Sequence, residues 1–307
     1  MTELISIFVN NIAPVLIVAG VGYVAGQKLR VDGQTVGQLI FNVFSPALVF
    51  FSLYESQIGG SELGLLIAVT AMFQLSMAAL AYLVMNFQRA DRVERSSVML
   101  GAFCMNAGNF GLSIAAFAFG DAVLARAVVI YISNTLLNYT LGVFVASSGR
   151  QSPRGALLNV VRVPAVYASV AALLVRGLNI ELPIVIYRAA GVLKDAAIPL
   201  MLILLGIQLS QSARLQKLTL VTTGVLLKLL IAPLVGIGLA LVFQLEALAM
   251  ISFALQTSMP TAVITLILAK EYQLDETLML NLIMATTLLS PFTLSVIILF
   301  LRQLPLP

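Results

Sequence analysis

The sequence predicts an all-α membrane protein with ten transmembrane helices, arranged as a 5+5 inverted repeat in which helices 4 and 9 are broken and cross. Three observations support this prediction: long apolar runs, basic residues confined to alternate loops, and a polar pattern that recurs in both halves. Of the 307 residues, 60% are hydrophobic and only 10% are charged. A soluble domain carries about 25% charged residues, so this chain lacks the charge to cover a water-facing surface.

The composition also excludes several kinds of site. The chain has no histidine and a single cysteine, which rules out a disulfide framework, a Cys/His zinc site, a Ser-His-Asp triad and a Cys-His dyad. We therefore expect no bound metal and no cofactor. The net charge of +4 comes from loops that set membrane topology, and it requires no nucleic-acid partner.

The apolar runs have the length of membrane helices. A bilayer core requires roughly 20 apolar residues per helix, whereas barrel strands alternate over about 10 residues. Helices also satisfy backbone polar groups internally, where the lipid bilayer offers no water. The first run follows only Glu3 and no basic segment, so we expect a membrane helix rather than a signal peptide. The ten runs lie at 4–25, 37–54, 63–87, 96–119, 122–146, 157–176, 183–209, 218–243, 246–269 and 277–301.

Lysine and arginine are distributed asymmetrically among the loops. Of 17 basic residues, eleven fall in or next to one set of alternate loops, three in or next to the other set, and three lie deeper within the runs. Basic loops remain in the cytoplasm, so we expect an inner-membrane protein with both termini outside, in the periplasm. The eleven are Lys28, Arg30, Arg89, Arg92, Arg95, Arg150, Arg154, Arg162, Arg214, Lys217 and Lys270.

The two halves of the chain resemble each other. Run four contains F-C-M-N-A-G-N-F-G and run nine contains F-A-L-Q-T-S-M-P-T, so that Asn106 aligns with Gln256. We therefore expect one five-helix unit over 1–155 and a second over 156–307. Because five is odd, the second unit enters the membrane from the opposite side, an architecture of many secondary transporters. Chance similarity of leucine-rich segments is the alternative, and the matching polar positions argue against it.

Other pairs of runs agree with this repeat. Runs five and ten share a Thr-Leu-Leu pattern, and each opens with an aspartate placed to cap its helix, Asp121 and Asp275. Runs two and seven each contain a proline, Pro46 and Pro199. We expect these two prolines, together with Pro260 of run nine, to act as helix breaks or hinges.

Runs four and nine contain residues that interrupt helices. In run nine, Gln256 and Ser258 precede Pro260, and a proline removes one N–H and displaces the carbonyl four residues earlier. Each segment can therefore unwind and present the N-terminus of a half-helix, which favours an anion. Close packing through small residues is the alternative, but two matched breaks favour a substrate site. Run four carries two carboxamides and two glycines that lower helix propensity: Asn106, Gly108, Asn109 and Gly111.

On these motifs the chain resembles the auxin efflux carrier family. The resemblance rests on N-A-G-N-F-G-L at 106–112, F-S-P-A-L-V-F at 44–50, I-P-L…L-G at 198–206 and S-M-P-T-A at 258–262. Bacterial members of the family are of similar size, and some are regarded as malonate or malate permeases. The plant PIN-FORMED auxin carriers are larger relatives, and this chain lacks the long central loop of many of them.

The resemblance implies a fold akin to that of the bile acid sodium symporters, with elevator-type alternating access. Helices 1, 2, 6 and 7 (4–54 and 157–209) would form a scaffold that is often dimeric. Helices 3–5 and 8–10 (63–146 and 218–301) would form a mobile transport domain. By the same resemblance, Asn109 beside the crossing and Ser45 in helix 2 would contact the substrate carboxylate.

Lys228 lies about ten residues into run eight, too deep to reach the headgroups easily. A charge at the bilayer centre costs at least about 2.5–3.5 kcal/mol, so function is the default interpretation. Our hypothesis is that its ammonium acts as a tethered cation at the crossing, with Asn138 and Gln74 as neighbours. A lysine that pairs with a lipid headgroup through a tilted helix is the alternative.

Energetics favours the export or facilitated passage of a small organic anion. One charge crossing about 100 mV is worth roughly 2.3 kcal/mol, so a monoanion leaves an inside-negative cell without a coupled ion. Proton coupling would require an acidic side chain deep in the membrane, and Asp195 is the only acid that lies within a run and away from its ends. Sodium-coupled uptake stays open, because carbonyl oxygens can bind hard cations. An intramembrane enzyme with a Ser-Lys dyad built on Lys228, or a receptor, are the remaining alternatives.

Overall fold

The computed structural model describes residues 2–29, 31–147, 163–210 and 216–303. The helices of these ranges are interrupted by five short π-helical turns. The α-helices are α1 (Thr2–Ile7), α2 (Ala13–Lys28), α3 (Gly33–Leu39), α4 (Ser45–Tyr54), α5 (Gly60–Phe87), α6 (Arg92–Phe103), α7 (Ser113–Phe119), α8 (Asp121–Leu137), α9 (Val143–Ala146), α11 (Pro164–Gly177), α12 (Ile184–Leu209), α13 (Leu218–Leu226), α14 (Ala232–Val242), α15 (Ala247–Thr257), α16 (Ile264–Glu271) and α17 (Glu276–Leu301). The π-helical turns are η1 (Phe8–Ile12), η2 (Ile40–Phe44), η3 (Ala107–Leu112), η4 (Asn138–Gly142) and η5 (Leu227–Ile231).

The all-helical class is confirmed for the described residues. Seven helices are long and apolar enough to span a membrane: Glu3–Lys28, Gly33–Tyr54, Gly60–Phe87, Asp121–Ala146, Ile184–Leu209, Leu218–Val242 and Glu276–Leu301. The other predicted runs coincide with shorter helices, run four with α6 and η3–α7, run six with α11, and run nine with α15 and α16. The start of run six and the expected boundary between the two units lie outside the described residues, as do Arg30, Arg150, Arg154, Arg162 and Arg214.

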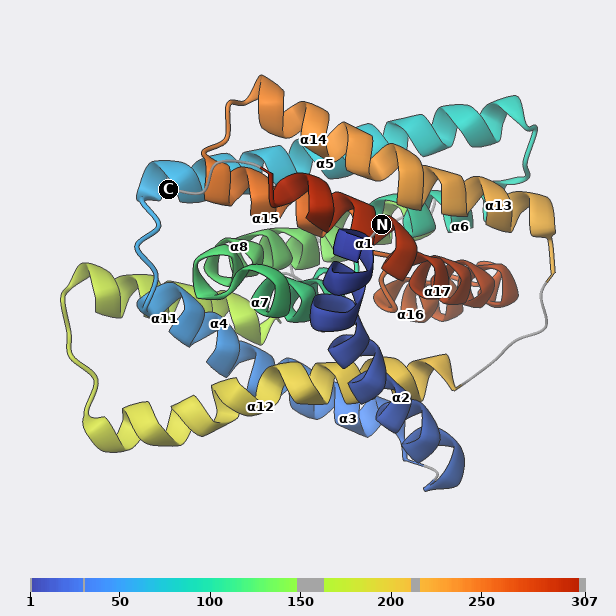
Figure 1. Ribbon diagram of the computed structural model, residues 1–307. Helices are drawn as coiled ribbons and strands as arrows, with labels where there is room; N and C mark the ends of the chain where they lie inside the picture. Colours follow the sequence, from blue (N-terminus) through green and yellow to red (C-terminus); the bar gives the residue numbers. More distant parts are fainter. Residues whose placement is uncertain (1, 30, 148–162, 211–215, 304–307) are drawn as a thin grey trace.

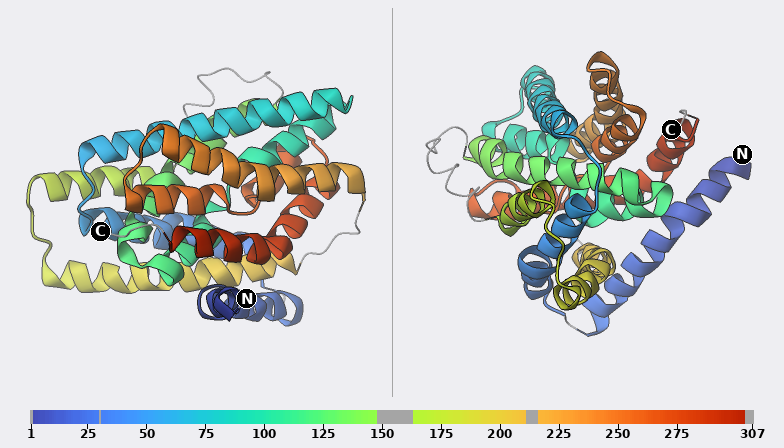
Figure 2. Two further views of the ribbon diagram at one scale, coloured as in Figure 1. Left: turned by 45° about the horizontal axis from the view of Figure 1, so that its top comes forward. Right: turned by 90° about the vertical axis from the view of Figure 1, so that its left-hand side faces the viewer.

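The helices pack in two groups. In the first, α12 lies along α2 and contacts α3 and α4, while α11 packs on α4. A Cβ at Gly206 of α12 would collide with the Ala19 carbonyl oxygen of α2, the close approach that small residues permit between membrane helices. In the second group, α5 packs on α6 and α8, α15 on α8 and α14, and α13 on α17. Figures 1 and 2 show α12 with α2–α4 on one side of the molecule and α5, α13 and α14 on the other.

The two groups meet at the centre of the molecule. There α12 contacts η3, and α4 contacts α8. A second meeting point joins α1 to α17, where Arg302 at the end of α17 donates to Asn11 Oδ1 over 3.0 Å. The interruption at η3 therefore lies where both groups of helices converge.

The prolines of runs two and seven occupy different positions in their helices. Pro46 stands in the first turn of α4, directly after the π-helical turn η2, and the helix runs through both from Gly33 to Tyr54. Pro199 lies inside α12, which continues on both sides from Ile184 to Leu209. Pro199 therefore does not end its helix, and the break expected there is not present.

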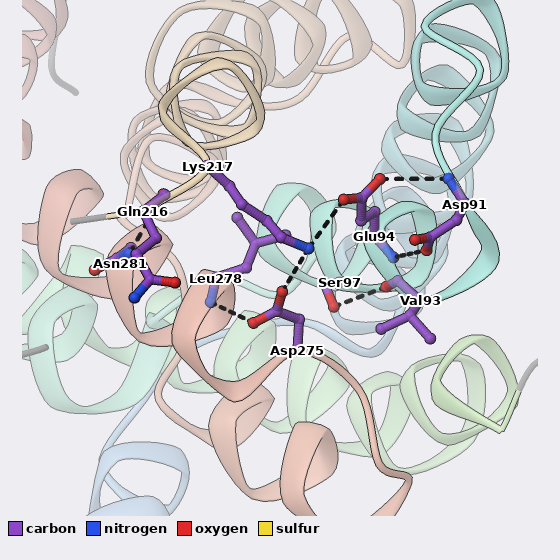
Figure 3. A network of polar contacts seen from close by, with 9 residues as sticks. All are labelled: Asp91, Val93, Glu94, Ser97, Gln216, Lys217, Asp275, Leu278 and Asn281. Atoms are coloured by element: carbon purple, nitrogen blue, oxygen red, sulfur yellow. Dashed lines mark hydrogen bonds and ion pairs between the residues drawn. The ribbon is translucent and has the colours of Figure 1, made fainter. Parts of the chain in front are cut away.

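Three helix N-termini meet in a polar cluster at one end of the second group (Figure 3). Lys217 precedes α13, and its Nζ lies 2.9 Å from Glu94 Oε1 and 2.8 Å from Asp275 Oδ2. Asp275 caps α17 by accepting the N–H of Leu278 over 2.8 Å. Asp91 and Glu94 form a capping box at the start of α6. The cluster thus joins the starts of α6, α13 and α17.

Hydrogen bonds keep this cluster ionised. Partial burial alone would raise the pKa of Asp275, but hydrogen bonds from the Leu278 N–H and from Lys217 hold this pKa below its ordinary value. The hydrogen bonds to Asp275 and Glu94 raise the pKa of Lys217. The capping role predicted for Asp275 is confirmed. The same role is wrong for Asp121, because Gly120 is the N-cap of α8 and no side chain caps that helix.

Candidate functional site

Two apolar segments leave the helical conformation and lie against each other. In the first, α6 ends at Phe103 and the helix resumes at Ala107. In the second, α15 ends at Thr257 and α16 begins at Ile264. Between these ends, Met105 and Thr261 form an isolated antiparallel bridge, so the two interruptions meet residue to residue.

The bridge is flanked by two equivalent hydrogen bonds. The Asn106 N–H donates to the Pro260 carbonyl over 2.9 Å, and the Ala262 N–H donates to the Cys104 carbonyl over 3.1 Å. An antiparallel pair is related by a local two-fold axis, so the counterpart of Asn106 in space is Ala262. The sequence alignment pairs Asn106 with Gln256, which is displaced by six residues from this pairing.

The last carbonyls of α6 find partners from other helices. The Thr261 hydroxyl donates to the Gly101 carbonyl over 2.8 Å, and Lys228 Nζ donates to the Ala102 carbonyl over 3.2 Å. A helix leaves its final carbonyls unpaired, and a cation there is favourable. Lys228, which lies in η5 and is 0% exposed, therefore caps the end of α6 at the interruption.

The expected neighbours of Lys228 make other contacts. Gln74 Nε2 donates to Asn134 Oδ1 over 2.6 Å and to Asn138 Oδ1 over 3.4 Å. Neither Gln74 nor Asn138 is a hydrogen-bond partner of Lys228 in the described part of the chain. The polar groups thus gather beside the interruption, but the lysine contacts a backbone carbonyl instead of their carboxamides.

Asn134 is a site residue that reasoning from the sequence missed. Its Nδ2 donates to the Met105 carbonyl over 3.0 Å, and its Oδ1 accepts the Met105 N–H over 3.4 Å. On the opposite segment, the Thr286 hydroxyl accepts the Thr261 N–H over 3.1 Å. Asn134 stands four residues before Asn138, so both lie on one helix face, and this spacing was the signal available in the sequence.

Several carboxamide atoms near the two interruptions are buried without a partner in the described residues. They are Asn106 Nδ2 and both Gln256 Nε2 and Oε1, which have no hydrogen bond within the described ranges. Buried polar atoms are nearly always paired in folded proteins. The Gln256 carboxamide lies so close to Gly111 that a Cβ there would collide with it. The two predicted residues Gln256 and Gly111 are therefore brought together, next to unsatisfied donors.

Ser45 and Gly108 are brought together by a residue that the sequence analysis did not name. Ser45 Oγ lies 3.0 Å from the hydroxyl of Tyr131, and a Cβ at Gly108 would lie 2.8 Å from the same ring. Asn109 is half-buried, and its carbonyl accepts the Ser113 hydroxyl over 3.0 Å. Tyr131 therefore links α4 to the start of η3.

The second segment offers fewer free groups than expected. The Ser258 hydroxyl donates to the Ala254 carbonyl of its own helix over 2.6 Å. The Gln256 carbonyl, expected to be freed by the proline, accepts the Met259 N–H over 3.2 Å. The Pro260 carbonyl is occupied by the first segment. The available polar atoms therefore come from the Gln256 side chain and the first interruption. In the described residues no group of three His, Cys, Asp or Glu could hold a metal ion.

Comparisons with known proteins agree with a transporter. Residues 150–298 match a family model described as "Membrane transport protein". Over 286 residues the chain is 29% identical to an uncharacterized transporter of Methanothermobacter thermautotrophicus, covering 92% of this chain and 94% of that protein. It is 24% identical over 287 residues to an uncharacterized transporter of Methanocaldococcus jannaschii, covering 90% and 93%.

Proposed function

We propose that the chain belongs to the membrane transport protein family that includes the auxin efflux carriers, because residues 150–298 match the family model, and we infer from this which cargo it carries and how. It is a secondary transporter that moves a small organic anion, a carboxylate of the auxin, malate or malonate kind, by elevator-type alternating access. Transport needs neither sodium nor a buried acid that carries a proton.

One observation supports the site more than any other. Asn106 and Gln256 place unpartnered carboxamide atoms at the crossing, next to the helix that begins at Ala107. Amide N–H groups and the positive end of a helix dipole both favour a carboxylate. Substrate would satisfy these donors, with Asn109, Ser45, Gly108 and residues Ser258 and Pro260 around it.

The architecture behind this mechanism is ten transmembrane helices in two inverted five-helix units. The two-fold relation of the Met105–Thr261 bridge supports it, as do the matching anchors Asn134 and Thr286. In this arrangement α6 with η3–α7 forms one crossing helix, and α15 with α16 forms the other. Both termini lie on the periplasmic side of the inner membrane.

The two groups of helices correspond to a scaffold and a transport domain. The packing of α12 on α2 and of α11 on α4 supports a scaffold built from helices 1, 2, 6 and 7. The transport domain comprises the helices that pack around α5, α8 and α15. Two copies associate through the scaffold in the lipid bilayer, as the family resemblance implies, while each transport domain moves against it.

The Lys228 ammonium takes the place that a bound sodium ion would occupy. It caps the end of α6, at the interruption where a bound cation would offset the same carbonyl dipoles. A Ser-Lys catalytic dyad requires a serine hydroxyl bonded to the lysine, and in the described ranges Lys228 donates to a backbone carbonyl only. This contact favours a structural ammonium over a catalytic base.

Sodium coupling is the second candidate, because a specific observation favours it. Gln74 Oε1, Gln256 Oε1 and Thr287 Oγ1 are buried oxygens without partners in the described part of the chain. Oxygen ligands of this kind are the ones that hard cations prefer. A sodium ion that binds such oxygens would couple uptake of the anion to the sodium gradient.

A flux screen in liposomes tests the proposal. Purified protein is reconstituted, and efflux of radiolabelled indole-3-acetate, malonate and malate is measured at a negative internal potential, with and without sodium. We expect sodium-independent flux of at least one carboxylate, faster when the potential drives the anion out. Flux that requires sodium would establish the second candidate, and no protein-dependent flux of any carboxylate would overturn the proposal.

Asn109→Ala tests the position of the site. We expect this change to abolish flux, because it removes the carboxamide beside the crossing, while expression and dimerisation remain intact. Asn42→Ala is the matched control, since Asn42 also lies in an apolar run but its Nδ2 donates to the Gln38 carbonyl of its own helix. Normal flux in Asn109→Ala would show that the substrate does not bind at the crossing.

A further inference from the structure

We propose that Asn134 is a positioning residue, a clamp whose carboxamide holds the peptide of Met105 extended and so sets the Asn106 side chain in place. This inference rests on the proposed function, because Asn106 is assigned there to the substrate. Asn134 itself does not touch the cargo. It acts through the backbone of the first interruption.

The carboxamide of Asn134 contacts Met105 as a neighbouring strand would. It donates to the Met105 carbonyl over 3.0 Å and accepts the Met105 N–H over 3.4 Å. On its other side, Met105 is held by the bridge to Thr261. A carboxamide offers the same donor and acceptor as a peptide group, so this extended residue is bound from both sides although no sheet surrounds it.

Gln74 fixes the orientation of the clamp. Its Nε2 donates to Asn134 Oδ1 over 2.6 Å, which requires the oxygen of Asn134 to face α5 and leaves Nδ2 for the Met105 carbonyl. Both carboxamides are buried. Polar networks in a low-dielectric interior are strongly directional, so α5, α6 and α8 are tied together at this one peptide.

The sequence at the first interruption explains why a clamp is needed. The residues Cys104, Met105 and Asn106 include neither proline nor glycine, and Asn106 lowers helix propensity only weakly, so partners from elsewhere are needed to end α6 at Phe103. Peptide groups that leave a helix inside a membrane must find other partners. The pair of bonds from Asn134 supplies them. In the second segment, Pro260 already breaks the helix and Thr286 contributes only a single hydroxyl contact.

Cys104 reports directly on the clamp. It is the single cysteine of the chain, it is 0% exposed, and it immediately precedes Met105. We expect Asn134→Leu to raise the rate of maleimide labelling of Cys104 by about tenfold, since loss of these buried hydrogen bonds lets the segment open more often. Gln74→Leu should raise it by a smaller factor, because Asn134 remains but loses its orientation.

The matched control is Ser133→Ala. Ser133 is buried beside Asn134, but its hydroxyl donates to the Val129 carbonyl of its own helix, so labelling of Cys104 should stay at the wild-type rate. Asn134→Asp, which keeps the shape of the side chain and in its protonated form keeps a donor and an acceptor, should label more slowly than Asn134→Leu. Each variant is compared at equal amounts of monodisperse protein.

Transport kinetics provide the second readout. With malonate as the probe, Asn134→Leu should raise the apparent KM by about tenfold while the maximal rate per folded transporter changes much less, because binding by Asn106 is weakened. Labelling in Asn134→Leu that matches Ser133→Ala would overturn the clamp. Labelling of Cys104 needs no substrate. If the wild-type protein transports no carboxylate, the proposed function is wrong, but the labelling result still tests the role of Asn134.

Discussion

The two interruptions at the centre of the molecule are held in different ways. The first consists of three residues, Cys104 to Asn106, and the second of six, Ser258 to Val263. The first contains no helix breaker and is bound by Asn134 and capped by Lys228. The second contains Pro260 and receives a single hydroxyl contact from Thr286.

This difference shows that equivalent breaks can have unlike origins. The second interruption is encoded locally, because a proline cannot continue the hydrogen-bond pattern of a helix. The first is imposed by partners from other helices, since its own residues are compatible with a helix. Removing a distant partner should therefore damage the first interruption more than the second, which Pro260 and the bridge to Met105 both stabilise.

The largest effect is expected for Lys228→Ala. The change removes the cap of the Ala102 carbonyl and the only cation found at the crossing in the described residues. We expect either complete loss of carboxylate flux or flux that becomes dependent on sodium, which would occupy the vacated position. Liposome flux with and without sodium distinguishes these two results.

The control for Lys228→Ala is Lys194→Ala. Lys194 also lies within an apolar run, but it pairs with Glu55 over 2.7 Å and is partly exposed. An ion pair of this kind contributes at most about 1 kcal/mol, so flux should remain near the wild-type value. If Lys228→Ala transports the anion at the wild-type rate without sodium, the hypothesis that the Lys228 ammonium acts as a tethered cation is wrong.

The next largest effect is expected for Gly111→Ala, on the helix that follows the first interruption. A Cβ at Gly111 would collide with the buried Gln256 carboxamide, so the Gln256 side chain must move out of its place in the site. Overpacking of this type costs about 1–3 kcal/mol, and flux should fall by about tenfold or more. Gly108→Ala should be milder, because the Tyr131 ring can shift away from the new methyl group. Equal flux in the two variants would contradict close contact between Gly111 and Gln256.

Much of the fold could be predicted from the sequence because it follows from run length and patterning. All ten apolar runs coincide with helices in the described residues. In run nine, Pro260 predicts the interruption of the helix directly. The sequence also predicts an interruption in run four, but the glycines and carboxamides that indicate it follow Phe103, where α6 ends. Its break depends on partners distant in sequence, which a local pattern does not reveal.

The site was predicted in part for the same reason. Gln256 and Gly111 lie together, as do Gln74 and Asn138. Alignment of the repeats pairs Asn106 with Gln256, whereas the two-fold relation of the Met105–Thr261 bridge makes Ala262 the counterpart of Asn106. Hydrogen bonds in space, unlike residue identities in a leucine-rich sequence, fix the register of such a crossing.

A smaller effect is expected for Pro260→Ala. The alanine restores an N–H at a segment whose extended conformation is already stabilised by the bridge, so the interruption should persist but become less rigid. We expect flux to fall by only a few-fold, consistent with a loss of about 1 kcal/mol or less. Cys104 labelling should stay at the wild-type rate. A loss of flux as severe as that of Lys228→Ala would show that the second interruption is as dependent on one residue as the first.

The smallest effect concerns α8 and α17, where the same contrast recurs. Asp275 caps α17 and pairs with Lys217, whereas α8 has no side-chain cap beside Asp121. Loss of a cap costs about 0.5–2 kcal/mol, so Asp275→Ala should lower Tm by a few degrees, about 2–4 °C per kcal/mol. Asp121→Ala should leave Tm unchanged.

The pH dependence of Tm separates the charge of Asp275 from its shape. Its pKa is lowered in the folded state from an ordinary value of 3.8, so the carboxylate stabilises the fold above that pH and this contribution is lost as the pH falls through the folded pKa. The difference in Tm between the wild type and Asp275→Ala should therefore be largest near neutral pH and shrink below about pH 4. A difference that stays constant down to pH 3 would mean that Asp275 acts by packing alone, and the contrast with Asp121 would then say nothing about charge.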